Sequence, residues 1–271
     1  LKEQACAAIK AMQPKDRQSL KQFHRLLRPA MQVTLAVSTP SPEQVVVQQI
    51  ERKEVDGLTA QLLLLGRRAI GERIPAVLVT ISNSASKRIQ KEAVLLVSDE
   101  GAASKIWTWE GKEAELAKNL SNRFALLAID YNRTDDAERI QDILTAISYL
   151  QRQFKQVHII GNGMAGLWVL LAASVVSVEG KVVVDAAQFD AEDDNEFSER
   201  LFIPCLRRIG DFKTVLTLTA PRPLLVHNAH PNFPHDWAEN AYKIAAALDR
   251  LLWSNATFAN EKLVEWIGSV K

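Results

Sequence analysis

Cysteine and net charge are both scarce in this chain of 271 residues. Only Cys6 and Cys205 are present, too few for a framework of disulfides, and their spacing matches no zinc site. Lys and Arg (33) nearly balance Asp and Glu (32), and the basic residues are interspersed with acidic ones. Because nucleic acids are bound by basic patches or stripes, we expect no nucleic-acid partner.

Long hydrophobic runs are absent as well. The longest, QLLLLG and LWVLLAASVV, fall short of the roughly 20 residues that a membrane helix needs. Hydrophobic residues make up 47% of the chain, enough for a substantial core, so we expect one soluble domain over 1–271 without membrane contact. The sequence starts at Leu1, so a signal peptide of an exported protein would not be visible in it. Compartment and oligomeric state are left open.

Two kinds of element order follow one another along the chain. Residues 1–40 are expected to form a helical extension, because ACAAIKAM and SLKQFHRLL carry apolar residues at helical spacing on either side of Pro14. The next four predicted strands are 45–52, 58–66, 74–81 and 93–99. Turn signals at Asp56-Gly57 and at 66–71 favour an antiparallel arrangement of the first three.

From residue 93 onward, short strands alternate with helices. The later predicted strands are 124–130, 157–161, 181–186 and 223–229. The predicted helices of this part include 137–154, 164–176, 237–252 and 260–270. The pattern predicts an α/β fold, with a mostly parallel sheet, antiparallel strands at its start and helices on both faces.

The stretch QVHIIGNGMAGLW at 156–168 permits two interpretations. Gly161, Gly163 and Gly166 between a strand and a helix, with Asp185 after the next strand, match a dinucleotide-binding fingerprint. That fold normally begins with this unit, whereas here most strands precede Gly161 and two clear ones follow. The alternative is the strand-to-helix turn of an α/β-hydrolase, G-x-S-x-G, which lies past the middle of the chain.

Three stretches carry a resemblance to a known superfamily: AERIQDILTAISYLQ, VHIIGNGMAGLWVLLAA and FIPCLRRIGDFKTVLTLTAPRPLLVHNA. With them, residues 45 to 250 resemble the acetyl xylan esterase and dienelactone hydrolase branch of the α/β-hydrolase superfamily. The run Ala220-Pro221-Arg222-Pro223-Leu224-Leu225 is the most specific part. The resemblance implies the α/β-hydrolase fold and a nucleophile elbow at 161–166.

Laid on that elbow, Gly163 occupies the position of the nucleophile and Met164 that of an oxyanion donor, with Asp99, Glu100 and Gly101 in the loop of the other donor. Glycine offers no oxygen or sulfur for an acyl-enzyme, and it relieves the strain of the elbow. The resemblance places the acid after PLLVHNA, where Asp236 lies slightly beyond the usual offset, or after the preceding strand, where Asp185 lies. It places the catalytic histidine in a loop before the last helix, but no histidine follows His235, and the candidate bases are His227, His230 and His235.

These departures predict an esterase homologue that is catalytically impaired or inactive. We expect no cofactor and a small-molecule or carbohydrate ligand, which the backbone amides at the start of the 164–176 helix could help to bind. Trp107 and Trp109 follow the VSDEGAASK loop, at the expected mouth of the pocket, and could stack on a sugar or serve packing. The alternative is an active hydrolase with an unrecognised nucleophile, for which the candidates are Ser98, Ser104 and Ser198.

Two polar segments are interpreted as solvated loops, so no metal site is predicted. His227, His230, His235 and Asp236 offer zinc-type ligands, but prolines interrupt their spacing. The acidic run 190–196 lacks the glycine-centred loop of a calcium motif. Finally, the resemblance predicts a gap or an unusually short connection at Asp130 and Tyr131, where relatives have a long loop.

Overall fold

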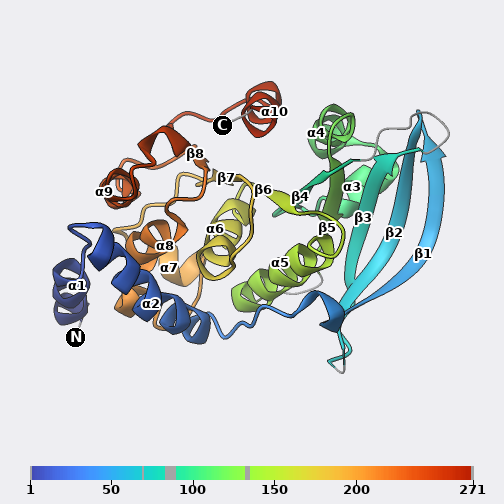
Figure 1. The fold of residues 1–271 in the computed structure, drawn as a ribbon. Coiled ribbons are helices and arrows are strands. Elements are labelled where there is room, and N and C mark those ends of the chain that lie inside the picture. Colours follow the sequence, from blue (N-terminus) through green and yellow to red (C-terminus); the bar gives the residue numbers. More distant parts are fainter. Residues whose placement is uncertain (1, 69, 83–89, 132–134, 270–271) are drawn as a thin grey trace.

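A nine-stranded sheet forms the centre of the molecule, and its strands follow the order β1-β2-β3-β5-β4-β6-β7-β8-β9 (Figure 1). The computed structural model describes residues 2–68, 70–82, 90–131 and 135–269. The strands are β1 (Val45–Val55), β2 (Leu58–Arg67), β3 (Ile74–Ile81), β4 (Glu92–Ser98), β5 (Ala125–Ile129), β6 (Gln156–Asn162), β7 (Val182–Asp185), β8 (Leu224–His227) and β9 (Leu251–Trp253).

The sheet changes from antiparallel to parallel within its first half, as the sequence predicts. β1, β2 and β3 pair antiparallel, and so does β3 with β5, whereas all later neighbours are parallel. Asp56 and Gly57 join β1 to β2 with φ angles of 50° and 77°, the left-handed backbone of a tight two-residue hairpin turn. β4, β6, β7 and β8 lie side by side, so their carboxyl ends meet at one edge of the sheet.

Helices cover both faces of this sheet (Figure 1). Alternate residues of each strand point to opposite faces, which divides the buried apolar residues into two clusters. The larger cluster packs against α1 (Lys2–Ala11), α2 (Arg17–Thr34), α5 (Asp136–Leu150), α6 (Ala165–Val175), α7 (Glu196–Glu199), α8 (Asp211–Thr219) and α9 (His235–Ala245). The smaller packs against α3 (Ala103–Thr108), α4 (Gly111–Ser121) and α10 (Asn260–Gly268).

Within the described ranges, no helix is both long enough and apolar enough to span a membrane.

The helical extension is a packed part of the fold. Phe23 and Met31 on the inner face of α2 are buried, and Arg28 donates hydrogen bonds to the carbonyl oxygens of Ser174 and Leu218, where α6 and α8 end. A cationic side chain at the carboxyl ends of two helices satisfies carbonyl groups that have no partner within those helices. Asp16 begins α2 by accepting a hydrogen bond from the Ser19 amide at 2.7 Å.

The prediction of one helix over 237–252 is wrong in its second half. α9 ends at Ala245, the left-handed backbone of Ala246 (φ 55°) terminates it, and Leu251–Trp253 form the edge strand β9. Three strands therefore follow β6, where the sequence indicated two. The leucines match a helical pattern locally, but pairing with Leu224–Val226 of β8 satisfies their backbone groups and extends the sheet.

β5 ends at Ile129 and α5 begins at Asp136, and of the connecting residues 130–135, 132–134 lie outside the described residues. The gap or unusually short connection expected at Asp130 and Tyr131 stays a prediction. Asp130 accepts hydrogen bonds from the amides of Ala103 and Ser104 at 2.7 and 2.9 Å. Its carboxylate thus fixes the start of α3 and the loop that leads to it from β4.

Replacing a buried residue of the extension should destabilise the whole protein. We expect Phe23→Ala to lower the free energy of unfolding by about 3–5 kcal/mol, because Phe23 is 2% exposed and its removal leaves a cavity. Val33→Ala on the same helix is the control, since Val33 is 80% exposed and should change stability by less than about 0.5 kcal/mol. Urea denaturation of both variants measures the difference, and equal stabilities would contradict the packing of α2.

Candidate functional site

Gly163 forms the turn between β6 and α6 at the carboxyl edge of the sheet, the position that the sequence predicts for it. Its φ of 61° lies in the left-handed region, which glycine adopts without strain. β6 is flanked by β4 and β7, so the turn lies where several strands end together. In open α/β sheets this edge is where ligands bind.

The other two glycines of the motif are explained by packing. A Cβ atom at Gly166 would lie 2.0 Å from the Asp185 carbonyl oxygen, and one at Gly161 would lie 2.6 Å from the Gly166 Cα. Both positions require glycine because α6 begins in direct contact with β6 and β7. The fingerprint spacing thus has a cause in the packing of this helix, without a bound pyrophosphate.

The Asp99 carboxylate occupies the space in which a side chain at position 163 would begin. A Cβ at Gly163 would be 2.3 Å from Asp99 Oδ2 and 2.7 Å from Oδ1. Oδ2 also accepts a hydrogen bond from the Met164 amide at 3.0 Å. The sequence suggested that this amide is free to bind a ligand, and the structure corrects that expectation, since a carboxylate of the chain already satisfies it.

Asp185 satisfies a second amide at the same turn. Its Oδ2 accepts a hydrogen bond from the Gly163 amide at 3.2 Å, and its Oδ1 accepts from the Ala187 amide and the Asn228 side chain, each at 2.8 Å. With both oxygens engaged by the protein, Asp185 is poorly placed to bind a ribose. The dinucleotide interpretation therefore lacks a free ribose-binding acid, and packing of α6 already explains Gly161 and Gly166.

His227 ends β8 directly opposite Asp185 on β7, and it is 2% exposed. Its Nδ1 accepts a hydrogen bond from the Phe258 amide at 3.4 Å, and its ring stacks on the Phe258 ring at 5.7 Å between centroids. Nε2 has no hydrogen-bond partner among the described residues. Burial lowers the pKa of His227, which outweighs the opposing effect of Asp185, so the ring is neutral at pH 7 with its proton on Nε2.

These groups line one cavity of about 870 Å³ between the strand ends and the two helices α4 and α10. It brings together Gly163, Asp99, Glu100, Asp185 and His227 from the sequence prediction. It also contains residues that the sequence analysis missed, because no motif marks them: Lys105, Lys112, Glu113, Glu115, Thr257, Phe258, Asn260 and Glu261. Their signal is tertiary, since α4 and α10 contact each other from distant parts of the chain (Figure 1).

Ser98 is the one candidate nucleophile that lines this cavity. It is 2% exposed, and its hydroxyl donates to Glu113 Oε1 at 3.3 Å. Ser104 is exposed at the start of α3, and Ser198 is exposed in α7 with its hydroxyl donating to the Asn195 carbonyl oxygen. No hydrogen bond joins any of these serines to a histidine within the described part of the chain, so none has the paired base that activates a serine.

The other histidines and Asp236 lie away from the lining of this cavity. His230 Nδ1 is 3.8 Å from Asp190 Oδ2, and the His235 ring packs on Trp253 at 4.8 Å. Asp236 is exposed in the first turn of α9, where its carboxylate, His235 and Glu239 offer ligand atoms within 4.8 Å of one another. Glu239 pairs with Lys243 at 2.7 Å, which leaves this group no better suited to a metal than an ordinary helix surface.

Gly101 and the tryptophans serve the surrounding scaffold. Gly101 has a φ of 83° and lies against Asp130. The Lys53 ammonium lies 4.0 Å from the centroid of the Trp107 ring, and Lys118 approaches Trp109. Neither tryptophan lines the cavity among the described residues, so their predicted place at its mouth is wrong.

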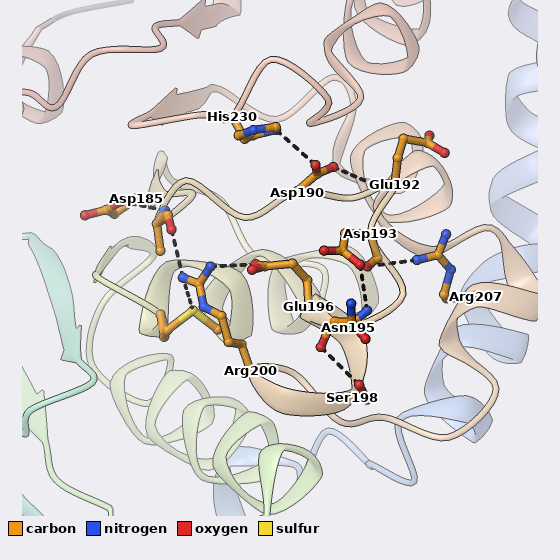
Figure 2. Close-up of polar contacts among 12 residues, drawn as sticks. Asp185, Asp190, Glu192, Asp193, Asn195, Glu196, Ser198, Arg200, Arg207 and His230 are labelled. Carbon is orange, nitrogen blue, oxygen red and sulfur yellow. Dashed lines mark hydrogen bonds and ion pairs between the residues drawn. The ribbon is translucent and has the colours of Figure 1, made fainter.

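The acidic run 190–196 forms a loop tied to arginines and to its own backbone (Figure 2). Arg207 pairs with Asp194 at 3.0 Å, and Arg200 pairs with Glu196 at 2.5 Å. Arg200 also donates to the Ala187 carbonyl oxygen and lies 3.2 Å from the Met164 sulfur, so this loop is anchored beside the turn at Gly163. Within the loop, Glu192 and Asn195 donate backbone amides to Asp190 and Asp193.

Comparison with known proteins identifies the fold. No protein-family model and no curated protein sequence matches the chain. Among solved structures, the methylesterase BT1017 matches at a TM-score of 0.70 and 15% identity, over 98% of this chain and 66% of its own. A Bacteroides fragilis protein assigned as an acetyl xylan esterase matches at a TM-score of 0.70 and 11% identity, over 96% of this chain and 87% of its own. The glucuronoyl esterase of Solibacter usitatus matches at 0.64 and 11%, over 93% of both chains.

These neighbours are carbohydrate esterases with the α/β-hydrolase fold, and the chain has that fold, as its sequence predicts.

A side chain at position 166 should be far more costly than one at an open turn. We expect Gly166→Ala to lower the free energy of unfolding by more than about 3 kcal/mol, since its Cβ would overlap the Asp185 backbone and α6 would have to shift. Gly71→Ala is the control: Gly71 has a φ of 77° but no atom within 4 Å of a Cβ, so about 1–2 kcal/mol of backbone strain is expected. Similar losses in urea denaturation would contradict the contact of α6 with β7.

Stability should fall in mild acid, in part through His227. Its folded-state pKa lies below the ordinary value of 6.5, so the unfolded chain binds the proton more strongly, and stability is lost as the pH falls below 6.5. His227→Gln should reduce the slope of stability against pH by at most about 1.4 kcal/mol per pH unit. Burial also lowers the pKa values of His24 and His158, so their contribution to the pH dependence of stability should remain in this variant. Denaturant titrations between pH 7 and 5 test this, and an unchanged slope would contradict it.

Proposed function

We propose that this protein binds a carbohydrate in the cavity at the carboxyl edge of its sheet and does not hydrolyse esters through an acyl-enzyme. The fold is that of carbohydrate esterases, and neighbours named as acetyl xylan and glucuronoyl esterases support a ligand of that class. Because the same fold serves unrelated activities, the chemistry has to be argued from the residues of the cavity.

The position of the Asp99 carboxylate is the observation that carries this proposal. Acyl transfer develops negative charge on the substrate oxygen, and catalysis requires free N–H donors aimed at that charge. At this turn the Met164 amide donates to Asp99 and the Gly163 amide donates to Asp185. An oxyanion would meet two carboxylates instead of two donors, which raises the barrier.

The parts needed for proton transfer are also poorly arranged. A serine nucleophile requires a base within hydrogen-bond reach, and a third group that orients that base. Among the described residues, His227 is the histidine that lines the cavity, but it is the last residue of β8, and the resemblance places the acid, not the base, shortly after this strand. The loop after β9, where the resemblance places the histidine, reads Ser254-Asn255-Ala256-Thr257.

Binding remains compatible with this arrangement. The cavity offers both hydrogen-bond acceptors, such as Asp99 Oδ1, and a donor, the Nε2–H of His227. A sugar presents hydroxyl groups that donate and accept, and the Phe258 ring lines the same cavity as an apolar surface. The active hydrolase with an unrecognised nucleophile remains the second candidate, with Ser98 as its residue because it alone among the proposed serines lines the cavity.

The purified protein should neither hydrolyse p-nitrophenyl acetate above a heat-denatured control nor be labelled by a fluorophosphonate, since position 163 has no nucleophilic atom. Ser98→Ala should leave both results unchanged. Saturable turnover that disappears in Ser98→Ala would establish the second candidate, and turnover that survives in it would point to another nucleophile. Either result would overturn the proposal of inactivity.

Restoring a serine should not restore activity. Gly163→Ser should lower the free energy of unfolding by about 1–3 kcal/mol, because the residue takes a left-handed conformation and its Cβ meets Asp99. Asp99→Ala combined with Gly163→Ser should regain part of that loss, and both variants should remain inactive for lack of a base. Additive effects in denaturant titrations would show that the Asp99 carboxylate does not fill the space at position 163.

A further inference from the structure

The cavity beside Gly163 carries a large excess of negative charge. Six carboxylates and two lysine ammonium groups line it: Asp99, Glu100, Glu113, Glu115, Asp185 and Glu261 against Lys105 and Lys112. The chain as a whole has a formal net charge of +1, so the excess is a local property of this cavity. A concave site lined by charges of one sign concentrates ions of the opposite sign.

The lysines do not cancel this charge at the turn. Lys105 pairs with Glu100 at 2.5 Å and lies 3.6 Å from Glu113, so one ammonium group serves two carboxylates. In the part of the chain that the structure describes, no Lys or Arg forms an ion pair with Asp99, Glu115 or Glu261. These three carboxylates come from three separate segments that line the cavity: the loop after β4, α4 and α10.

A buried group independently indicates that a ligand with an acceptor oxygen binds here. His227 is 2% exposed and lines the cavity, and its Nε2 has no partner among the described residues. Because Nδ1 accepts from the Phe258 amide, Nε2 carries the proton and can only donate. A buried donor without a partner costs about 1–3 kcal/mol, which a bound hydroxyl oxygen would recover. A metal ion would need the lone pair that this tautomer lacks.

We infer that the ligand of this cavity is a sugar that carries a protonated amino group, and that sugars with a carboxylate are rejected. The inference rests on the proposed function, because it assigns a charge class to the carbohydrate proposed above. The ammonium group lies among Asp99, Glu115 and Glu261, and a hydroxyl oxygen accepts from His227. Like charges oppose the entry of a uronic acid, so the site selects by repulsion as well as by attraction.

Three oligosaccharides of matched size test the charge class by isothermal titration calorimetry. They are the dimer of glucosamine, the dimer of N-acetylglucosamine and the dimer of galacturonic acid, at pH 6.5 and low salt. We expect the amino sugar to bind at least about tenfold more tightly than its acetylated form, and the uronic acid not to bind. Raising the ionic strength to about 0.5 M should reduce the preference for the amino sugar, because salt screens the carboxylates.

Charge-neutral variants identify the carboxylates responsible. Asp99→Asn and the double variant Glu115→Gln/Glu261→Gln should each lower the preference for the amino form several-fold, and the double variant should leave binding of the acetylated dimer unchanged. Glu115 and Glu261 are exposed, so their replacement should leave the fold intact. Glu239→Gln is the control: it removes a half-buried carboxylate on α9 that pairs with Lys243 and does not line the cavity, and it should leave the preference unchanged.

Each outcome decides between the two proposals. Binding of the amino sugar, weakened by the cavity variants and unaffected by Glu239→Gln, supports the inference. Equal binding of the acetylated and uronic dimers, or a preference for the amino form that survives both cavity variants, overturns the charge class while carbohydrate binding stands. Absence of binding by all three dimers overturns carbohydrate binding itself, and the charge class with it.

Discussion

The hydrogen bond from the Met164 amide to the Asp99 carboxylate determines what this site can do. The first turn of α6 carries amides without helical partners and the positive end of the helix dipole, so an anion there is stabilising. In this chain the anion belongs to the protein. Its carboxylate lies so close to Gly163 that a side chain there would displace it, which makes the glycine and the aspartate a matched pair. The same contact that stabilises the start of α6 engages the amide that, under the proposed function, an oxyanion would need.

The rest of the cavity agrees with this arrangement. A neutral histidine ends β8, and carboxylates of α4 and α10 line the same cavity. The structural neighbours show that the fold is that of carbohydrate esterases, at 11–15% identity. At that identity the backbone is retained while most residues differ, because packing of the core constrains the sheet far more than it constrains exposed loops.

The order of the elements could be read from local patterns, and the failures have one cause. Short apolar strands, the hairpin at Asp56-Gly57 and the break at Pro14 all depend on neighbours in sequence, and the sheet follows from them. The sequence predicts Leu251–Trp253 as the end of a helix, because nothing local marks them as a strand. Their strand forms by pairing with β8, in which Leu251 pairs with Leu224, 27 residues earlier in the chain. Trp107 and Trp109 were likewise assigned to the cavity mouth, whereas lysines from β1 and α4 approach their rings.

The sequence by itself determined the α/β order of strands and helices, the turn at Gly163 and the lack of a nucleophilic atom there, because strand periodicity, glycine spacing and residue chemistry are local properties. The resemblance to the α/β-hydrolase superfamily then predicted which α/β fold this order forms. Tertiary structure alone decided that Asp99 fills the space of the missing side chain and that the Met164 amide is already bonded. It also brought the carboxylates of α4 and α10 into the same cavity as His227. Residues far apart in the chain meet in these contacts, and their distances depend on how the helices pack against the sheet.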